Sequence, residues 1–445
     1  MNQAQSFLPA DRHALRQFVS KPVYQLVISW VLLFPLLFLT AHGSFSIDHQ
    51  SQNQESQYGA QALTSTGSGS TLSRLELLFV CATLCFAMFK SAGRIATVLK
   101  RDKLLLLLPL LALLSPLWSQ APLNSLVYAL ANLVVTLFAV YATLRFTPER
   151  QVELFLSAGI IMIALSLGTI AFLPSMGIDN FHGNGAWQGI CTQKNPFATA
   201  VCYLVMPAFY VRASGFFQKA ALGLYFVVAL VCVIMSQART GWLLFAISVA
   251  FVVFLKVFRR TGRSEKRLIV AFAVPLIALV VITGVAYSAE IAIMLGKDPT
   301  LTGRTVIYSA IFTELQQTPL LGFGYRAFFI GLTGESANFA LRSGLIGLGN
   351  AENPILEIWL ELGIVGVICL FILVVQCCRN IVTCLGGNSS KYIQWCVMMI
   401  FLNLLSLLGG DKIMDALTLE WLVFAMAYVS LSAQARQIRS LRAAT

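Results

Sequence analysis

Residues 354–377 read PILEIWLELGIVGVICLFILVVQC, a run in which only Glu357 and Glu361 carry charge. An α-helix rises 1.5 Å per residue, so this run is long enough to cross the roughly 30 Å hydrocarbon core of a bilayer. Its start is well specified, because Asn353 is a favourable N-cap and Pro354 a favourable first helical residue. The stretch therefore predicts a transmembrane helix.

Comparable apolar runs recur along the whole chain. The predicted spans are 23–42, 72–90, 104–119, 122–144, 152–174, 196–212, 217–236, 240–258, 268–288, 354–377, 391–409 and 415–433. Ser115-Pro116 is expected to bend the short third span. The pattern predicts an all-α polytopic membrane protein with about twelve transmembrane helices.

The composition agrees with this fold class. Of the 445 residues, 58% are hydrophobic and only 11% are charged, whereas soluble domains carry about 25% charged residues. Soluble, disordered and disulfide-stapled proteins are excluded, and the ten cysteines are interpreted as structural thiols. The net charge of +12 reflects the positive-inside rule rather than a nucleic-acid partner.

The distribution of basic residues predicts the orientation. With the N-terminus in the cytoplasm, 23 of the 31 Lys and Arg residues fall on the cytoplasmic side. The other eight are Arg74, Lys194, Arg239, Lys297, Arg304, Arg326, Arg342 and Lys412. Both termini are therefore expected in the cytoplasm. The first span is interpreted as a retained anchor, since no clear small-x-small cleavage site follows it.

The chain is expected to divide into three parts. Residues 1–288 hold the first nine transmembrane helices, 289–353 form a large outer loop with short amphipathic helices, and 354–445 hold the last three helices and a cytoplasmic tail. A second outer segment, 43–71, reads as a flexible loop. Because long ordered loops tend to be functional, 289–353 is the main candidate for a binding site.

A helix is expected inside this loop, with Thr302 as its N-cap and its end before Pro319. Its apolar residues recur at helical spacing: Val306, Ile307, Ala310, Ile311 and Leu315. Arg304 would lie in the first turn, where a cation opposes the helix dipole unless an anion is shared. Backbone donors and a guanidinium at a helix start would suit a phosphate, but this feature taken alone favours an ordinary surface arginine.

The stretch Leu321-Gly322-Phe323-Gly324-Tyr325-Arg326-Ala327 formally matches a glycine-rich dinucleotide fingerprint. No βαβ unit surrounds it, so nucleotide binding is rejected. The glycines are expected to allow a tight turn that presents Tyr325 and Arg326, either to stack on a sugar or simply to pack.

Other outer polar residues are candidates for the same site. Arg239 occupies a very short turn between two apolar helices, and Lys194-Asn195 follows a glycine-rich loop. Glu357 and Glu361 lie one turn apart within a predicted span, where carboxylates are costly and often functional; a polar contact between helices is the alternative. Asp411, Lys412 and Asp415 complete the set, and His182 is interpreted as structural.

Four motifs in this order resemble those of the O-antigen ligase/polymerase superfamily. They are Gln188–Asn195, Ser236–Thr240, Leu301–Thr305 with Pro319–Gly324, and Glu352-Asn353 followed by Gly363-Ile364-Val365-Gly366. The resemblance implies a GT-C-type, metal-independent, inverting glycosyltransferase of the bacterial inner membrane, without a cofactor and with its large periplasmic loop between the ninth and tenth helices. Its donor would be a glycan on undecaprenyl pyrophosphate, and its active site would face the periplasm.

Carried over from the family, Arg239 and Arg304 would bind and stabilise the departing pyrophosphate. Substrate contacts would come from Lys194, Asn195, Tyr325, Arg326 and Asn353. Glu352 stands where ligases of the family have a His, although the following spacing is intact. Glu352 is expected to act as general base or to position the acceptor hydroxyl.

The Glu at this position favours a polymerase, whose acceptor is also a lipid-linked glycan and which would work with a chain-length regulator. A ligase that transfers glycan to lipid A–core or to protein is the alternative. A transporter coupled to protons through Glu357 and Glu361 is an alternative from another class. Metal dependence through Asp298, Glu335 and Glu352 is allowed by the residue types but not required.

Overall fold

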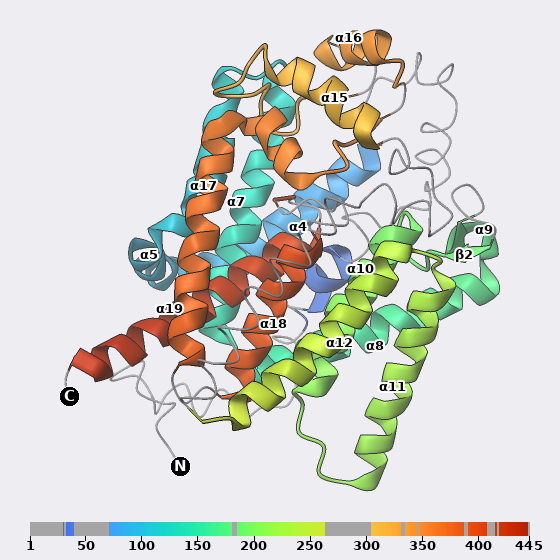
Figure 1. The fold of residues 1–445 in the computed structure, drawn as a ribbon, viewed down its shortest axis with the longest axis vertical. Helices are drawn as coiled ribbons and strands as arrows, with labels where there is room; N and C mark the ends of the chain where they lie inside the picture. Colours follow the sequence, from blue (N-terminus) through green and yellow to red (C-terminus); the bar gives the residue numbers. More distant parts are fainter. Residues whose placement is uncertain are drawn as a thin grey trace.

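The computed structural model describes residues 30, 33–39, 71–179, 185–262, 304–330, 334–345, 348–386, 390–406, 414–415 and 418–443. This part of the chain is almost entirely helical (Figure 1). A short antiparallel ladder pairs β1 (Ile178–Asp179) with β2 (Ala186–Trp187). The chain is thus a mainly α-helical, multi-pass membrane protein by fold.

Most of the long described helices overlap the predicted spans, although some of their ends differ by as many as ten residues, and several short helices lie outside the spans. Their bounds are α4 Thr71–Phe89, α5 Ala92–Arg101, α6 Leu107–Leu114, α7 Pro122–Arg145, α8 Pro148–Phe172, α9 Pro174–Gly177, α10 Lys194–Val205, α11 Phe216–Met235, α12 Arg239–Arg260, α15 Arg304–Leu315, α16 Gly334–Ser343, α17 Pro354–Leu385, α18 Lys391–Ser406 and α19 Leu419–Ala443. Short 3₁₀ turns cover Lys103–Leu106, Ser115–Leu117 and Met206–Phe209.

Five of the described helices are long and apolar enough to cross a membrane, namely α7, α8, α11, α12 and α17. A sixth span results if Leu77–Phe89 and α5, bent by 91° to each other, count together. The ninth predicted span, 268–288, and most of the first lie outside the described residues. The total of twelve therefore stays a prediction, as does the GT-C assignment.

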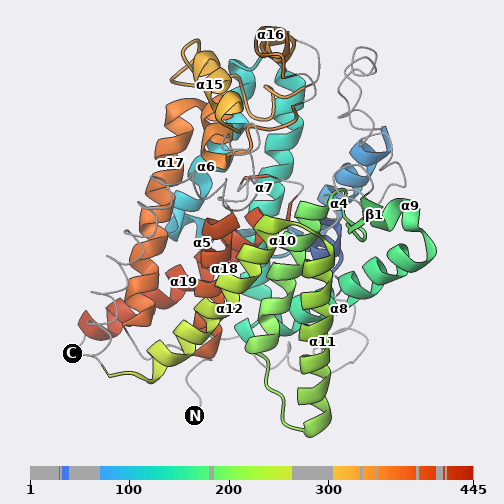
Figure 2. The same cartoon turned by 45° about the vertical axis from the view of Figure 1, so that its right-hand side comes forward.

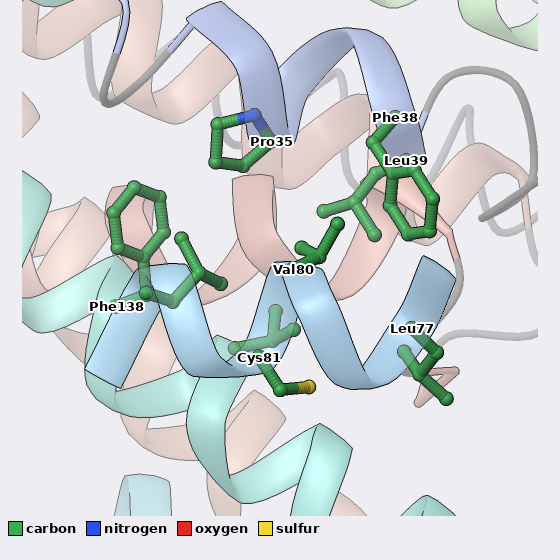
Figure 3. Close-up of a pocket in the computed structure, with 9 residues that line it drawn as sticks. Pro35, Phe38, Leu39, Leu77, Val80, Cys81 and Phe138 are labelled. Carbon is green, nitrogen blue, oxygen red and sulfur yellow. The ribbon is translucent and has the colours of Figure 1, made fainter. Parts of the chain in front are cut away.

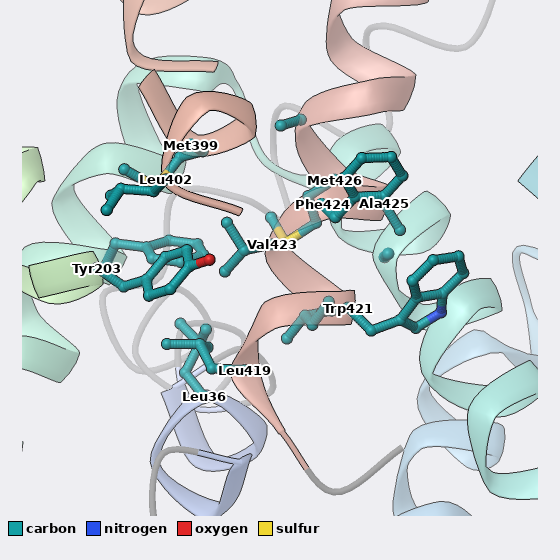
Figure 4. Packing of buried hydrophobic residues seen from close by; sticks show 14 of the residues in the cluster. Leu36, Tyr203, Met399, Leu402, Leu419, Trp421, Val423, Phe424, Ala425 and Met426 are labelled. Carbon is teal, nitrogen blue, oxygen red and sulfur yellow. The ribbon is translucent and has the colours of Figure 1, made fainter. Parts of the chain in front are cut away.

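Helix α19 lies at the centre of the bundle. It packs against α7, α17 and α18, while α18 also contacts α12 and α8, and α10 packs against α8, α11 and α12. The inner face of α19 carries Trp421 and Phe424, whose rings stack at 5.7 Å (Figure 4). α19 runs to Ala443, so most of the predicted cytoplasmic tail is helical.

The C-terminal part of α19 is held by an ion pair whose carboxylate is buried. Arg436 donates to both oxygens of Asp102, at 2.6 and 3.0 Å, and Asp102 immediately follows α5. The Asp102 side chain is only 3% exposed. This contact joins two segments that the sequence separates by more than 300 residues.

A narrow crevice lies between residues 33–39, α4 and α7. It is lined only by apolar side chains and a thiol, among them Phe38, Val80, Cys81 and Phe138 (Figure 3). None of the predicted site residues lines it. The crevice is therefore part of the helix packing and does not position the site.

Helices α15 and α16 form a small cap over one end of the bundle, away from the end of α19 (Figure 1). The cap has its own apolar core, in which Ile307, Ile311 and Leu315 of α15 meet Phe328 and Phe339. These three α15 residues belong to the predicted apolar face, whereas Val306 is 49% exposed. The helix in the loop is thus present, and Thr302, its predicted cap, lies outside the described residues.

Helix α17 is broken near the cap. Gly363 has φ +68° and ψ −171°, which are not helical. The unbroken helix would measure about 48 Å, well beyond the hydrocarbon core, whereas residues 364–385 alone would measure about 33 Å. The break therefore divides α17 into a short segment next to the cap, which carries Glu357 and Glu361, and a segment of membrane-spanning length.

Candidate active site

Glu352 lies on a strained turn immediately before α17. Its φ is +51°, a left-handed conformation that is uncommon for residues other than glycine. The amide N–H of Glu352 donates to Asn350 Oδ1 at 2.8 Å, and the neighbouring N–H of Ala351 donates to Glu357 Oε2 at 2.6 Å. Strain of this kind persists only where the surroundings hold it, and it is common at functional sites.

Tyr308 and Asn353 make further hydrogen bonds at this turn. The Tyr308 hydroxyl donates to the carbonyl oxygen of Glu352 at 3.2 Å. Asn353 caps α17, as predicted, because its Oδ1 accepts from the N–H groups of Ile355 and Leu356 at 2.9 and 3.2 Å. Because Oδ1 of Asn353 caps the helix, the predicted contact of Asn353 with substrate would fall to its side-chain amide nitrogen.

The start of α15 lies beside this turn. Arg304 is the first residue of α15 and stands one helical turn before Tyr308, which contacts Glu352. The helix that begins at Arg304 and the turn that carries Glu352 are thus joined by the Tyr308 hydrogen bond.

Lys194, Asn195 and Arg239 are brought together by two helix starts. Lys194 and Asn195 begin α10, and Arg239 begins α12. The two helices approach so closely that a Cβ on Gly241 would lie 2.4 Å from Ala198 Cβ. Both helix dipoles therefore place their positive ends in the same region, together with the exposed Arg239 and Asn195 and the half-buried Lys194. Such an arrangement is suited to an anion.

Tyr325 and Arg326 belong to the packing of the loop. Tyr325 is fully buried, and its hydroxyl donates to the Met414 carbonyl at 2.7 Å. Its ring is a packing element, and stacking on a sugar would require it to move. Arg326 forms an ion pair with Asp415, and its guanidinium lies 4.4 Å from the centre of the Tyr128 ring.

The environment of Arg326 keeps its charge. Burial by itself would lower the pKa of Arg326, but Asp415, followed by Tyr128 and Tyr325, raises the pKa above its ordinary value. The Asp415 side chain is 8% exposed and that of Arg326 is 23% exposed. A neighbouring carboxylate therefore offsets the positive charge that Arg326 could offer to a phosphate.

The residues around the start of α19 bond to the loop that carries Arg326 and to α7. Asp415 precedes α19 and pairs with Arg326, and Trp421 Nε1 donates to Thr136 Oγ1 of α7 at 2.7 Å. Burial, followed by the charge of Glu420, raises the pKa of the Cys191 thiol in the loop before α10.

Two glycines allow the loop of the cap to approach α17, and a third allows the same loop to approach Ser119. A Cβ on Gly363 would lie 2.0 Å from the Leu320 carbonyl oxygen, and a Cβ on Gly322 would lie 2.5 Å from the Leu360 carbonyl oxygen. Gly324 has φ +102° and lies against Ser119. The glycines of the Leu321–Gly324 motif therefore serve a close backbone approach and not a nucleotide.

Several residues of this region were missed by the sequence analysis. Glu314 is buried, and both of its carboxylate oxygens accept hydrogen bonds from Arg342 Nη2, at 2.7 and 2.8 Å. This contact joins α15 to α16. Asn350 and Tyr308 hold the Glu352 turn. Only Asn350 had a local signal, since Asn readily bonds the backbone two residues on.

The predicted metal alternative has little support from geometry. Glu335 pairs with Arg342 at 3.3 Å, and Asp298 lies outside the described residues. Among the residues that the structure describes, no three His, Cys, Asp or Glu side chains form a group that could hold a metal ion.

The fold and the site define a multi-pass helical membrane protein whose capped end gathers cations and a strained carboxylate. Residues 224–371 match the Wzy_C family, described as O-antigen ligase. The chain is also similar to the exopolysaccharide production protein ExoQ of Rhizobium meliloti (strain 1021), with 26% identity over 278 residues, 58% of this chain. It covers 60% of the length of that relative.

The family match includes three of the four motifs, and Gln188–Asn195 precedes it. Both comparisons support the resemblance of the chain to the O-antigen ligase/polymerase superfamily. The matched range extends from within α11 to within α17 and includes Arg239, Arg304 and Glu352, whereas Lys194 and Asn195 precede it.

Proposed function

We propose that this protein polymerises oligosaccharide repeat units carried on undecaprenyl pyrophosphate, as an inverting, metal-independent glycosyltransferase of the GT-C type. The site would face the periplasm of a bacterial inner membrane, with both termini in the cytoplasm. The observation that carries the proposal is the Glu352 turn, held in a left-handed conformation by Asn350, Glu357 and Tyr308. A backbone held in this way gives the Glu352 side chain a defined origin, which suits a carboxylate that must meet a reacting hydroxyl.

The reaction requires an acid-base group and a cation site. The acceptor hydroxyl oxygen would attack the anomeric carbon of the donor while the bond from that carbon to the pyrophosphate oxygen breaks. The hydroxyl proton would pass to the Glu352 carboxylate, and the configuration at the anomeric carbon would be inverted. The leaving pyrophosphate would take up the bonding electrons and meet Arg239, Arg304 and Lys194 at the helix starts.

Two findings support a polymerase over a ligase. Glu352 occupies the position at which the ligases have His, and the relative's name refers to exopolysaccharide production. Transfer to lipid A–core or to protein remains the second candidate, because the family match is described as O-antigen ligase. A chain-length regulator is a further expected partner.

Proton-coupled transport is less well supported. Glu357 accepts the Ala351 N–H, and Glu361 precedes the break at Gly363, in the short segment of α17 next to the cap. Coupling carboxylates of transporters lie near the bilayer midplane. Ligand-dependent proton flux in liposomes that Glu361→Gln abolishes would favour a transporter.

The deciding experiment uses purified protein in lipid with undecaprenyl-pyrophosphate-linked repeat units from its own host. One sample contains this donor alone, and the other also contains lipid A–core. A size ladder from the donor alone is expected for the polymerase. Transfer only in the presence of lipid A–core would identify a ligase, and turnover in neither sample would lead to the flux assay.

A further inference from the structure

Residues Pro319–Gly324 run along the side of the molecule beside the break in α17. Two leucines at its tip point outward, with Leu320 65% and Leu321 41% exposed. Exposed leucines are ordinary when scattered singly, but here two successive leucines are exposed beside further exposed apolar residues of α17. The arrangement raises the question of what covers them.

The carbonyl groups of this exposed segment are nearly all used within the protein. Ile364 N–H and Trp359 Nε1 both donate to the Pro319 oxygen, at 2.9 and 3.1 Å. Val365 N–H donates to Leu320 O at 3.4 Å, and Trp118 Nε1 donates to Leu321 O at 2.9 Å. Three successive carbonyls of an exposed loop are therefore satisfied without water.

The amide groups of the second half are used in the same way. Phe323 N–H donates to Leu360 O at 2.7 Å, and Gly324 N–H donates to Glu361 O at 3.0 Å. These are carbonyls that the break at Gly363 frees from the helix. Water would satisfy such groups on an ordinary surface loop, but inside a bilayer irregular backbone is tolerated only where the protein itself supplies the partners.

The leucines adjoin a helix, α17, whose exposed side chains are mostly apolar, as expected of side chains that face lipid. Below them, α17 exposes Val365, Ile368 and Phe371, by 36%, 51% and 67%. Above and beside them lie exposed Leu117 and Phe312, and the Phe312 ring packs edge-on against Trp359 at 6.4 Å. The exposed apolar residues of α17 thus begin at Val365, whose N–H is bonded to the Leu320 carbonyl of the loop.

Trp118 and Trp359 flank the segment. Each indole N–H is bonded to a carbonyl of the loop, so only the apolar ring remains for the surroundings. Tryptophan is enriched where a protein passes from the acyl chains to the headgroups of a bilayer, because one part of the ring system is apolar and the other polar.

We propose that Pro319–Leu321, together with Trp118 and Trp359, is inserted into the acyl-chain boundary of one leaflet, with lipid as the partner that covers Leu320 and Leu321. The break at Gly363 then lies at the membrane surface. Glu352 stands on the headgroup side of that surface, one short helical segment away. This inference rests on packing and hydrogen bonds and is independent of the reaction.

The test compares tryptophans introduced at two exposed leucines of the full-length protein in bilayers. Leu320→Trp places the probe on the segment, and Leu341→Trp places it on α16, the part of the cap farthest from the bundle (Figure 2). Leu341 is 79% exposed and serves as the matched control. The emission added by each substitution is obtained by subtracting the spectrum of the unchanged protein.

Each variant is measured in lipids brominated near the headgroup, in lipids brominated near the bilayer centre, and with iodide in the water. The Leu320→Trp emission should be quenched at least about twofold more by the shallow bromines than by the deep ones, and protected from iodide. The Leu341→Trp emission should respond to iodide and not to bromine.

Quenching of Leu320→Trp by iodide alone would overturn the proposal, as would quenching by the deep bromines alone. Leu321→Trp provides a second probe of the same segment if Leu320→Trp does not fold, as judged by its Tm and its elution profile. These outcomes do not depend on glycan transfer, so a protein without polymerase activity could still confirm the insertion.

Discussion

Charged side chains of the cap and its loop, and those at the starts of the helices, fall into two groups. In the first, arginines pair with carboxylates: Arg326 with Asp415 and Arg342 with the buried Glu314. In the second, Arg239 begins a helix, and Glu352 sits in a left-handed conformation. The first group holds segments together. In the second, the helix dipole makes the cation of Arg239 costly and the left-handed backbone makes Glu352 costly, a conformation that Arg326 of the first group shares at φ +51°. A bound substrate could compensate the second group.

The largest effect should come from Glu352→Gln. Loss of the carboxylate removes the proposed proton acceptor, and we expect kcat to fall about 1,000-fold with little change in Tm. The measurement is the rate of ladder formation from lipid-linked repeats. Glu153→Gln, at an exposed carboxylate on α8, should keep the full rate. If the Glu352→Gln enzyme kept the normal rate, Glu352 would belong with the first group, whose side chains hold segments together.

Arg239→Lys should follow, with a loss of about 100-fold in kcat/KM, because a lysine offers a point charge where the guanidinium offers a fork. Arg304→Lys should behave similarly. The matched control is Arg260→Lys, at the other end of α12, which should retain activity. Full activity of Arg239→Lys would show that a charge alone, and not a bidentate contact, is needed there.

Glu357→Gln should cost only a few-fold in rate, because the amide oxygen can still accept the Ala351 N–H. Glu357→Leu, which has no acceptor, should lower the rate about tenfold by loosening the Glu352 turn. The comparison is made at saturating substrate in the same ladder assay. If Gln proves as damaging as Leu, the charge of Glu357 matters in its own right.

The paired group should affect stability more than chemistry. Arg326→Ala leaves Asp415 largely buried without its cation, and we expect a loss of about 2 kcal/mol in unfolding free energy, reduced from a fully buried pair because Arg326 is 23% exposed. Thermal unfolding in detergent measures it. The double variant Arg326→Met with Asp415→Leu should recover most of the loss. A variant with unchanged Tm and no turnover would place Arg326 among the catalytic residues.

The sequence predicted single elements better than it predicted their partners. It located the start of α17 at Asn353-Pro354, since capping depends on adjacent residues. It did not reveal the break at Gly363, because a lone glycine is common in membrane helices. The backbone groups that replace the missing helical hydrogen bonds belong to a distant segment, Pro319–Gly324.

The same limit applies to the site. Arg326 was predicted to contact substrate, but its partner Asp415 lies 89 positions further along the chain. Glu314 and Tyr308 were not predicted to matter, because their partners Arg342 and Glu352 come from other segments. Side-chain periodicity says which face a residue occupies and nothing about which charge will meet it.

The amino-acid sequence alone determined the helical membrane class, most helix bounds and the order of the family motifs. These depend on apolar runs, caps and spacings, because a chain in lipid must satisfy its backbone within each helix. The tertiary structure decided which charges are paired, that Glu352 is held in a left-handed turn, and that a loop replaces the helical bonds around Gly363. Those features arise from contacts between residues far apart in the chain, whose geometry exists only once the helices pack.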